Sequence, residues 1–281
     1  MTIYCEIIMI HIDPDRCKRD LICVMECPTR ILEQKTKEAP PVLVRDGESL
    51  CIRCGHCVAV CPHEAFSHRD IPRDQIEPVR PELQVSFDQA AQLLKSRRSI
   101  RSYKSKPVER EKILDILNVA RFAPSGHNNQ PVSWLVIYNT DELRRLTAMV
   151  IDWMRQMQQD NPAMAAQWHF DRILAGYEIG MDGICRHAPH LLIAHADKAD
   201  PTAPDACVIA ASAAELGAFT MGLGVCWAGF FRTAALFWPP LSQALALPAG
   251  HLPYAALMLG YPRFVYYRIP PRKQLSITWR T

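Results

Sequence analysis

The sequence lacks several features that would decide its class at once. Its 32 basic and 29 acidic side chains nearly balance, and the net charge of +3 gives no reason to expect nucleic acid or an anionic membrane as a partner. The uncharged stretch from Leu216 to Phe231 is too short and too rich in glycine to cross a bilayer. No G-x-G-x-x-G follows a predicted strand, so the sequence leaves direct use of NAD(P)H open.

The N-terminus also lacks the basic start of an export signal, and Glu6 interrupts its apolar residues. We therefore expect a soluble, cytoplasmic protein. The chain nevertheless contains 11 cysteines, and seven of them lie between Cys17 and Cys61. In a protein that is not exported, such a dense group predicts metal ligands rather than disulfides.

The seven cysteines form two runs with one spacing. The run from Cys51 to Pro62 reads C-x2-C-x2-C-x3-C-P, and the run from Cys17 to Pro28 repeats it with Asp20 in place of one cysteine. In this pattern three close thiolates hold one iron–sulfur cluster, and the thiolate before proline holds the other. Structural zinc sites usually take two well-separated cysteine pairs, so we favour two clusters. The predicted ligands are Cys51, Cys54, Cys57 and Cys27 for one cluster, and Cys17, Cys23, Cys61 and Asp20 for the other.

Asp20 leaves three alternatives open. A carboxylate is a poorer match than thiolate to iron in a sulfide core, so Asp20 either completes a 4Fe-4S cluster weakly or leaves a 3Fe-4S cluster. The third alternative is that Asp20 is a solvated turn residue, a common position for aspartate.

Residues from about 8 to 71 resemble a bacterial two-cluster ferredoxin. This resemblance implies an internally duplicated fold of short hairpins and helices that relays single electrons. Pro72, Pro78 and Pro81 lie in a charged stretch that predicts an extended linker. We therefore expect a ferredoxin-like domain at 1–75, a linker at 76–85 and a second domain at 86–281.

The second domain has the pattern of an α+β fold. Ser86 and Gln89 form a predicted capping box before an apolar helical pattern. Further expected helices follow Pro107 as far as Pro124 and cover 142–158 and 205–221, and expected strands cover 132–138, 191–194 and 254–259.

Three segments of this domain could bind a ligand. The Arg97–Arg101 sequence RRSIR offers guanidinium forks and a hydroxyl suited to phosphate. The alternative is that its basic side chains only stabilise the C-terminal end of a helix through the helix dipole. The loop Ala123–Pro131 offers amides suited to a planar heterocycle, or only satisfies backbone groups. In Gly222–Gly229, glycines end a helix and allow a flat ligand to approach, whereas Trp227 and Cys226 are more typical of the core.

The order of these segments, with Ala188–Ile193 before the last of them and Gly260–Pro262 and Pro270–Arg272 after it, resembles the nitroreductase-like FMN family. The resemblance covers 86–281 and implies a homodimer, a central antiparallel sheet ringed by helices, and two FMN sites at the subunit interface. The residues that it implies as FMN contacts are Arg97, Arg98, Ser99, Arg101 and Arg272 for the phosphate and ribityl chain, Pro124, Ser125, Gly126 and Asn128 for the FMN of the other subunit, and Ala228 and Gly229 near the reactive ring.

Ala228 and Gly229 stand where other members of that family have a glutamate–glycine pair, so that only a backbone contact could be retained there. The charge distribution agrees with an anionic cofactor. Residues 1–75 carry 10 basic and 12 acidic side chains, and the remaining residues carry 22 and 17.

A ferredoxin segment joined to a flavin domain predicts an enzyme. We expect an FMN- and iron–sulfur-dependent reductase that takes electrons from a low-potential donor such as ferredoxin and reduces a nitroaromatic, a quinone or a similar electrophile. Alternatives are an electron-transfer module that docks on a partner enzyme and a flavin-based redox sensor. His127 and Tyr177 are candidate proton donors by residue type only, and each is more typical of a structural role.

Overall fold

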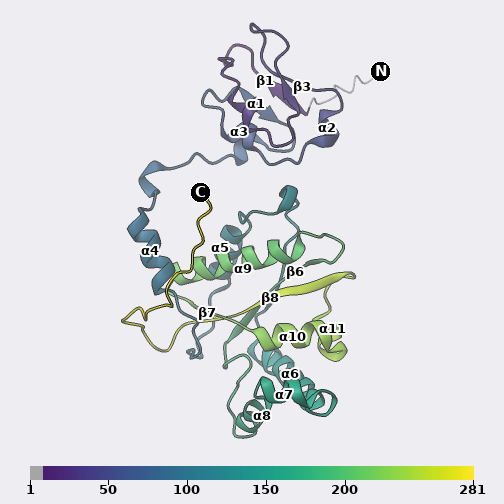
Figure 1. The fold of residues 1–281 in the computed structure, drawn as a ribbon, viewed down its shortest axis with the longest axis vertical. Coiled ribbons are helices and arrows are strands. Elements are labelled where there is room, and N and C mark those ends of the chain that lie inside the picture. Colours follow the sequence, from purple (N-terminus) through teal and green to yellow (C-terminus); the bar gives the residue numbers. More distant parts are fainter. Residues whose placement is uncertain (1–8) are drawn as a thin grey trace. The chain divides into compact units, whose positions relative to one another are not determined.

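The computed structural model describes residues 9–281 (Figure 1). The first residues of the expected ferredoxin-like domain, and the N-terminal residues on which the expected absence of an export signal rests, lie outside the described residues. Contacts divide the chain into two compact units. The first contains residues up to Gln84 together with His127–Asn129, and the second contains Val85–Gly126 and Gln130–Thr281.

The first unit is built from very short elements. Strand β1 pairs antiparallel with β4, and β2 pairs antiparallel with β3, so that Ile12 lies opposite Phe66 and Leu32 opposite Leu43. A small core contains Ile10, Leu32 and Phe66 and includes the thiol of Cys23. The elements are β1 (Ile10–Ile12), α1 (Ile22–Glu26), β2 (Leu32–Glu33), β3 (Val42–Leu43), α2 (Gly47–Leu50), α3 (His56–Ala59), β4 (Phe66–His68) and the 3-10 turns η1 (Arg73–Gln75) and η2 (Pro81–Leu83).

The backbone of this unit repeats itself. Arg19 and Arg53, which occupy the same place in the two cysteine runs, both adopt positive φ, at 62° and 51°. Leu21 and Gly55 repeat this at the starts of α1 and α3, with φ of 61° and 73°. A left-handed residue costs L-amino acids energy, so its recurrence at equivalent positions supports the duplicated fold expected from the spacing.

The second unit contains a four-stranded antiparallel sheet of order β5-β6-β8-β7. Side chains alternate along its strands. On β6, Leu191 and Ile193 enter one apolar cluster, whereas Leu192 and Ala194 enter the cluster on the opposite face. The strands are β5 (Ser133–Ile137), β6 (His190–Asp197), β7 (Gly224–Trp227) and β8 (His251–Gly260).

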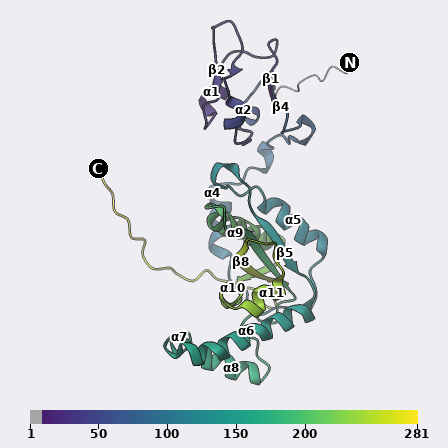
Figure 2. The same cartoon turned by 90° about the vertical axis from the view of Figure 1, so that its right-hand side faces the viewer.

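Helices cover both faces of this sheet (Figure 2). Helices α5 and α9 pack on one face, while α6, α10 and α11 pack on the other. The helices are α4 (Phe87–Ser96), α5 (Arg110–Ala120), α6 (Thr140–Asp160), α7 (Pro162–Gln167), α8 (Phe170–Glu178), α9 (Ala203–Thr220), α10 (Gly229–Phe237) and α11 (Pro239–Leu245), and a 3-10 turn, η3, spans Gly126–Asn128. The central antiparallel sheet ringed by helices is therefore confirmed.

The capping box expected at the start of α4 is present. The Ser86 hydroxyl accepts from the Gln89 backbone N–H at 3.3 Å, and the Gln89 side chain accepts from the Ser86 N–H at 2.8 Å. The sequence pattern does not predict β7, because Gly222 and Gly224 indicate a helix end and the close approach of a ligand rather than a strand. Gly222, with φ of 72°, does end α9, but the chain then enters a four-residue strand.

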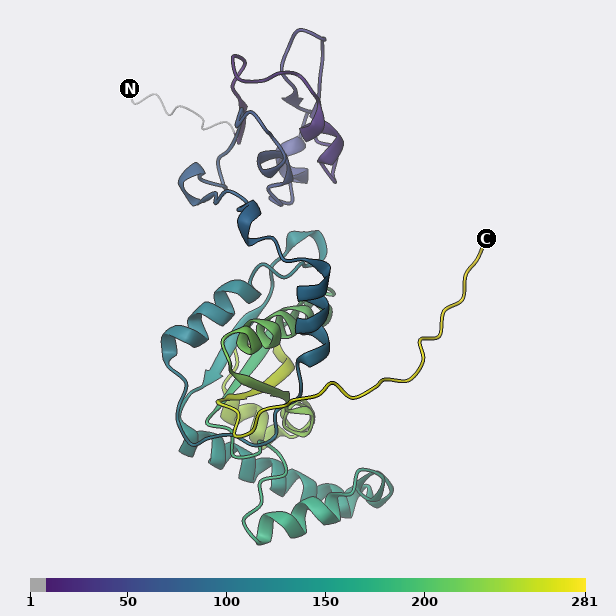
Figure 3. The same cartoon turned by 90° about the vertical axis from the view of Figure 1, so that its left-hand side faces the viewer.

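Residues after Pro262 form no helix or strand, and all of them are exposed (Figure 3). Apolar side chains are frequent in this segment: Phe264, Tyr267, Leu275 and Trp279 are each more than 60 % exposed. The predicted phosphate contact Arg272 lies within this extended segment and forms no ion pair with another described residue.

Candidate functional site

The four cysteines predicted to hold the first cluster line one small cavity of the first unit. Cys27 reaches it from the first run, and Cys51, Cys54 and Cys57 reach it from the second. Burial, with a smaller contribution from the neighbouring sulfurs, raises the pKa of the Cys57 thiol to about 12. Only a thiolate ligates iron, so a cation at this position must displace these protons.

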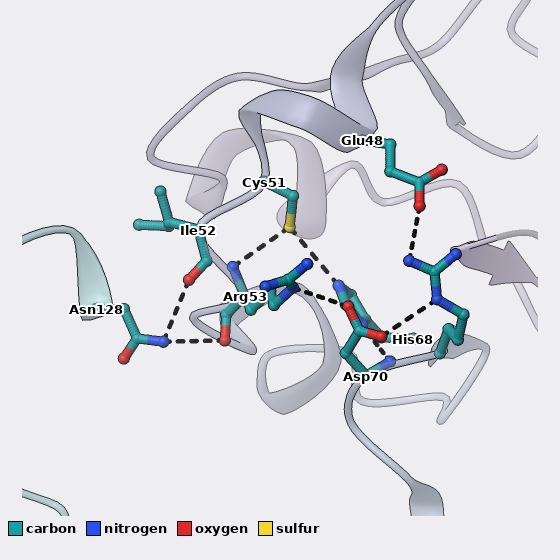
Figure 4. Close-up of polar contacts among 8 residues, drawn as sticks. Glu48, Cys51, Ile52, Arg53, His68, Asp70 and Asn128 are labelled. Carbon is teal, nitrogen blue, oxygen red and sulfur yellow. Dashed lines mark hydrogen bonds and ion pairs between the residues drawn. The ribbon is translucent and has the colours of Figure 1, made fainter. Parts of the chain in front are cut away.

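The rim of this cavity is held by polar contacts (Figure 4). The Cys51 sulfur accepts from the Arg53 backbone N–H at 3.4 Å and lies 3.6 Å from His68 Nε2. The Arg53 guanidinium pairs with Asp70 at 2.8 Å. Asn128 belongs to this unit by its contacts and donates to the carbonyl oxygens of Ile52 and Arg53 at 3.2 and 3.0 Å. Its role as an FMN contact stays a prediction.

The residues predicted for the second cluster also gather around one thiol. Burial raises the pKa of Cys23 to about 11, and Cys17, Cys61 and Asp20 lie close enough to contribute to this rise. The Asp20 carboxylate accepts from the Ile22 N–H at 3.3 Å and lies 3.7 Å from His63 Nε2. Asp20 is therefore both a turn residue and a neighbour of the thiols, which keeps each of its three alternatives open.

Within residues 9–281, no three His, Cys, Asp or Glu side chains converge as the ligands of a single metal ion do. In a cluster, the thiolates bind different iron atoms and need not meet at one point.

In the second unit, the RRSIR segment runs beside β7. The Ile100 N–H donates to the Val225 carbonyl at 2.9 Å. A Cβ at Gly224 would lie 2.7 Å from the Ile100 side chain, so glycine is required for this close approach. The segment is therefore fixed against the sheet rather than being a free helix end.

Arg97 has a carboxylate partner that the sequence reasoning missed. Its guanidinium lies 2.8 Å from Glu215 on α9, and the other Glu215 oxygen accepts from Trp227 Nε1 at 3.1 Å. The Glu215 side chain is only 8 % exposed. Glu215 lies 118 positions from Arg97 in the sequence, so no local pattern could have revealed the pair.

Other predicted contacts meet at a larger cavity, of about 500 Å³. Arg101 lines it from the RRSIR segment, and Gly229 lines it from the start of α10. Ala228 is buried directly before Gly229. An added Cβ at Gly229 would meet no atom within 4 Å, so the missing side chain leaves open space at this edge.

The remaining predicted contacts lie elsewhere. Pro124 and Ser125 line a separate cavity of about 210 Å³ between α5 and α9. A Cβ at Gly126 would lie 2.5 Å from Thr202. The structure thus brings Arg101 and Gly229 to one cavity but leaves Pro124, Ser125 and Arg272 away from it.

The sequence reasoning missed several side chains of the larger cavity. Trp168 and Phe230 provide aromatic surface, with ring centroids 6.1 Å apart, and Arg186 and Arg232 provide two further guanidinium groups. Tyr177 lines a different cavity and His127 belongs to the first unit, so neither candidate proton donor lines this one.

Comparison with known proteins identifies both parts of the chain. The model of the nitroreductase family matches residues 94–261. The chain belongs to the nitroreductase family. Residues 15–66 match the model of a 4Fe-4S dicluster domain, so the protein is a nitroreductase-family oxidoreductase that also carries an iron–sulfur domain.

Two curated relatives have names in the same class. An NADH dehydrogenase/NAD(P)H nitroreductase of Methanothermobacter thermautotrophicus is 24 % identical over 182 residues, which are 63 % of this chain and 80 % of that one. A Cr(VI) reductase of Pseudomonas sp. strain G-1 is 27 % identical over 173 residues, which are 61 % of this chain and 65 % of that one.

Solved structures agree on the fold. An FMN-bound nitroreductase of Bacteroides fragilis superposes with a TM-score of 0.56 at 21 % identity, covering 68 % of this chain and 99 % of that one. Among residues 9–281, none of the helices is long and apolar enough to span a bilayer.

Proposed function

We propose that the protein is an iron–sulfur flavoprotein reductase that passes electrons from a low-potential donor, such as ferredoxin, through two clusters to FMN and on to a small electrophile. The observation that carries the proposal is the cavity of about 500 Å³ beside Arg101 and Gly229, in a chain that also holds two groups of gathered cysteines. A cavity of this size is ordinary for a cofactor or small ligand.

The residues around the cavity fit an anionic, planar cofactor. Arg101 forms no ion pair with another described residue. The open space at Gly229 admits a flat ring close to the backbone. An anionic group near Arg101 would therefore pair with a guanidinium that no described carboxylate binds.

FMN, when bound, accepts electrons one at a time and can deliver them as a hydride-like pair. In our proposal, Arg97, Arg98, Ser99, Arg101 and Arg272 hold its phosphate and ribityl chain, and Ala228 and Gly229 lie at its ring. The buried pair with Glu215 holds the Arg97 guanidinium at the start of the RRSIR segment.

Among the described residues, no carboxylate or histidine lines the cavity. Its titratable thiol is Cys226, and burial raises the pKa of that thiol, so that it retains its proton at neutral pH. Trp168 and Phe230 line the cavity with aromatic surface and carry no group that could deliver a proton to a substrate. We therefore assign proton delivery to solvent that enters from the open side.

For the clusters we propose the ligands predicted from the spacing: Cys27, Cys51, Cys54 and Cys57 for a 4Fe-4S cluster, and Cys17, Cys23, Cys61 and Asp20 for a second, 4Fe-4S or 3Fe-4S, cluster. The gathering of the first four around one cavity and of the others around Cys23 supports this division.

We also propose a homodimer, in which Pro124, Ser125, Gly126 and Asn128 contact the FMN of the partner subunit, and a cytoplasmic location. Helix α9 supports dimer formation. It packs against the sheet, yet Val208 and Ile209 on its other side are 44 % and 41 % exposed. An apolar helix face of this kind is typical of a surface that pairs with another chain.

The experiment is anaerobic reconstitution followed by measurement of FMN, iron and sulfide per chain and of dithionite-driven reduction of 4-nitrobenzamide and a benzoquinone. We expect one FMN, two clusters and turnover. Two tight zinc ions without sulfide would overturn the cluster assignment. Full cofactor content without turnover of either compound would favour an electron-transfer module or a redox sensor.

A further inference from the structure

The cavity beside Arg101 and Gly229 has a marked charge asymmetry. Arg101, Arg186 and Arg232 line it, and no aspartate or glutamate of the described part of the chain does. None of the three guanidinium groups forms an ion pair with another residue in the range 9–281. Glu215, the nearest carboxylate that acts on Cys226, is already bound by Arg97 and Trp227.

Arg232 is the most unusual of the three. Its Nε is buried and lacks a hydrogen-bond partner among the described residues. A buried N–H of a charged group without an acceptor costs free energy, and native proteins usually satisfy such groups with protein, water or ligand. Arg232 lies one turn into α10, whose N-terminus has no side-chain cap and begins at the cavity with Gly229. The helix dipole therefore adds to the positive potential.

Arg186 reaches the same space from a different element. It lies in the loop before β6, where it and His187 both adopt positive φ, at 57° and 53°. Arg101 and Arg186 both lie close enough to the Cys226 thiol to oppose the rise of its pKa. The two guanidinium groups therefore act on one side of the cavity.

Besides the guanidinium groups, the cavity has an apolar wall, which is formed by Trp168, Ile184, Phe230 and Met258. A ligand that satisfies both parts has a flat apolar body and an anionic end. Arginine forks match a carboxylate in two parallel hydrogen bonds.

We infer that the reductase site recognises a carboxylate-bearing, planar apolar substrate, with Arg186 and Arg232 as the residues that bind its carboxylate. This inference rests on the proposed function, because it assigns Arg101 and Gly229 to FMN and leaves the other two guanidinium groups for a second ligand. The substrate class is therefore an anionic aromatic or conjugated electrophile.

The test is calorimetric titration of the FMN-loaded protein with 4-nitrobenzoate and with its neutral isostere 4-nitrobenzamide. A charge-assisted hydrogen bond corresponds to about 10- to 150-fold in affinity, so the carboxylate compound should bind tighter than the amide by at least about tenfold. Arg186→Gln and Arg232→Gln should each remove most of this preference. Arg145→Gln, an exposed change on α6, is the matched loss of one positive charge and should leave it intact.

Two results would overturn the inference. One is equal binding of the two compounds by the unmodified protein. The other is loss of FMN from Arg186→Gln or Arg232→Gln after dialysis, which would assign these arginines to the cofactor. Because Arg186 is exposed, its variant tests the inference even if Arg232→Gln does not fold. Selective binding without reduction of either compound would contradict the proposed turnover and leave the recognition of the carboxylate supported.

Discussion

The Arg97 guanidinium and the Glu215 carboxylate form an ion pair of 2.8 Å between the RRSIR segment and α9. Glu215 is almost fully buried and Arg97 is 25 % exposed, so neither charge can be removed without consequence for the other. The residue expected to bind the FMN phosphate is therefore also a structural residue, and this dual role changes how its substitution must be tested.

Arg97→Ala should weaken FMN binding by about 10- to 150-fold, the equivalent of one lost charge-assisted hydrogen bond. It should also leave the Glu215 carboxylate buried without its partner. Breaking a buried ion pair costs about 3–5 kcal/mol of unfolding free energy. Because Arg97 is partly exposed, we expect a loss of about 3 kcal/mol, at the lower end of this range. Thermal unfolding and FMN retention after dialysis measure the two effects.

A double variant, Arg97→Ala with Glu215→Gln, separates them. Removing the orphaned charge should restore most of the unfolding free energy while FMN binding stays weak. If the double variant regains FMN affinity as well, Arg97 acts only through the stability of α9 and does not hold the phosphate.

Gly229→Ala should fold normally and bind FMN poorly. The added methyl meets no protein atom within 4 Å, and alanine is favoured over glycine in a helix. It would occupy space expected for the flavin, and forced overpacking costs about 1–3 kcal/mol, or roughly 5- to 150-fold in affinity. Gly217→Ala on α9, where an added Cβ also meets nothing, is the matched control. Equal FMN affinity for both variants would show that the flavin ring does not lie at this edge of the cavity.

His190 should make the second unit sensitive to mild acid. Its Nε2 accepts from the Val108 N–H at 2.9 Å, so Nδ1 carries the proton and donates to the Tyr138 carbonyl at 2.9 Å. Burial lowers the pKa of His190 below its usual value, since the folded state holds the ring neutral. Stability from this residue is therefore complete above its unfolded pKa of about 6.5 and is lost as the pH falls below that value.

His190→Phe checks this directly. At pH 7.5 it should lower the unfolding free energy by about 1–3 kcal/mol, because the buried Val108 N–H loses its acceptor. At pH 5.5 the difference from the unmodified protein should be smaller, since the variant has no imidazole to protonate. A difference that stays constant between the two pH values would show that folding does not change the pKa of His190.

Much of the architecture was predictable because its signals are local. The cysteine spacing indicated the duplicated iron–sulfur domain, and Ser86 with Gln89 marked the start of α4 correctly. The features that escaped prediction depend on tertiary contacts. In the sequence, Glu215 is an ordinary helical glutamate, and only the packing of α9 places it beside Arg97. Arg186 lies in a loop, and no sequence pattern predicts its positive φ. Strand β7 was missed because four residues between glycines give almost no periodicity.

Asp20→Cys tests the ligand set proposed for the second cluster. A fourth thiolate should make that cluster more resistant to loss of one iron, since thiolate matches iron in a sulfide core better than carboxylate. Iron and sulfide per chain after exposure to air or chelator provide the measurement, with Asp15→Cys as an exposed control for an added thiol. If the unmodified protein already retains a full 4Fe-4S cluster as firmly as the variant, Asp20 is an adequate ligand.

The central claim is that electrons reach FMN through the clusters, and the most direct measurement compares two electron donors. Cys54→Ser with Cys57→Ser removes two thiolates from the cavity of the first unit, and Cys207→Ala removes a buried thiol far from it in the sequence. We predict that the double variant keeps FMN and dithionite-driven turnover, because dithionite can reduce the flavin directly, but loses turnover driven by reduced ferredoxin. The Cys207 variant should keep both. An unchanged ratio of the two rates in the double variant would contradict the account, since electrons would then bypass the clusters.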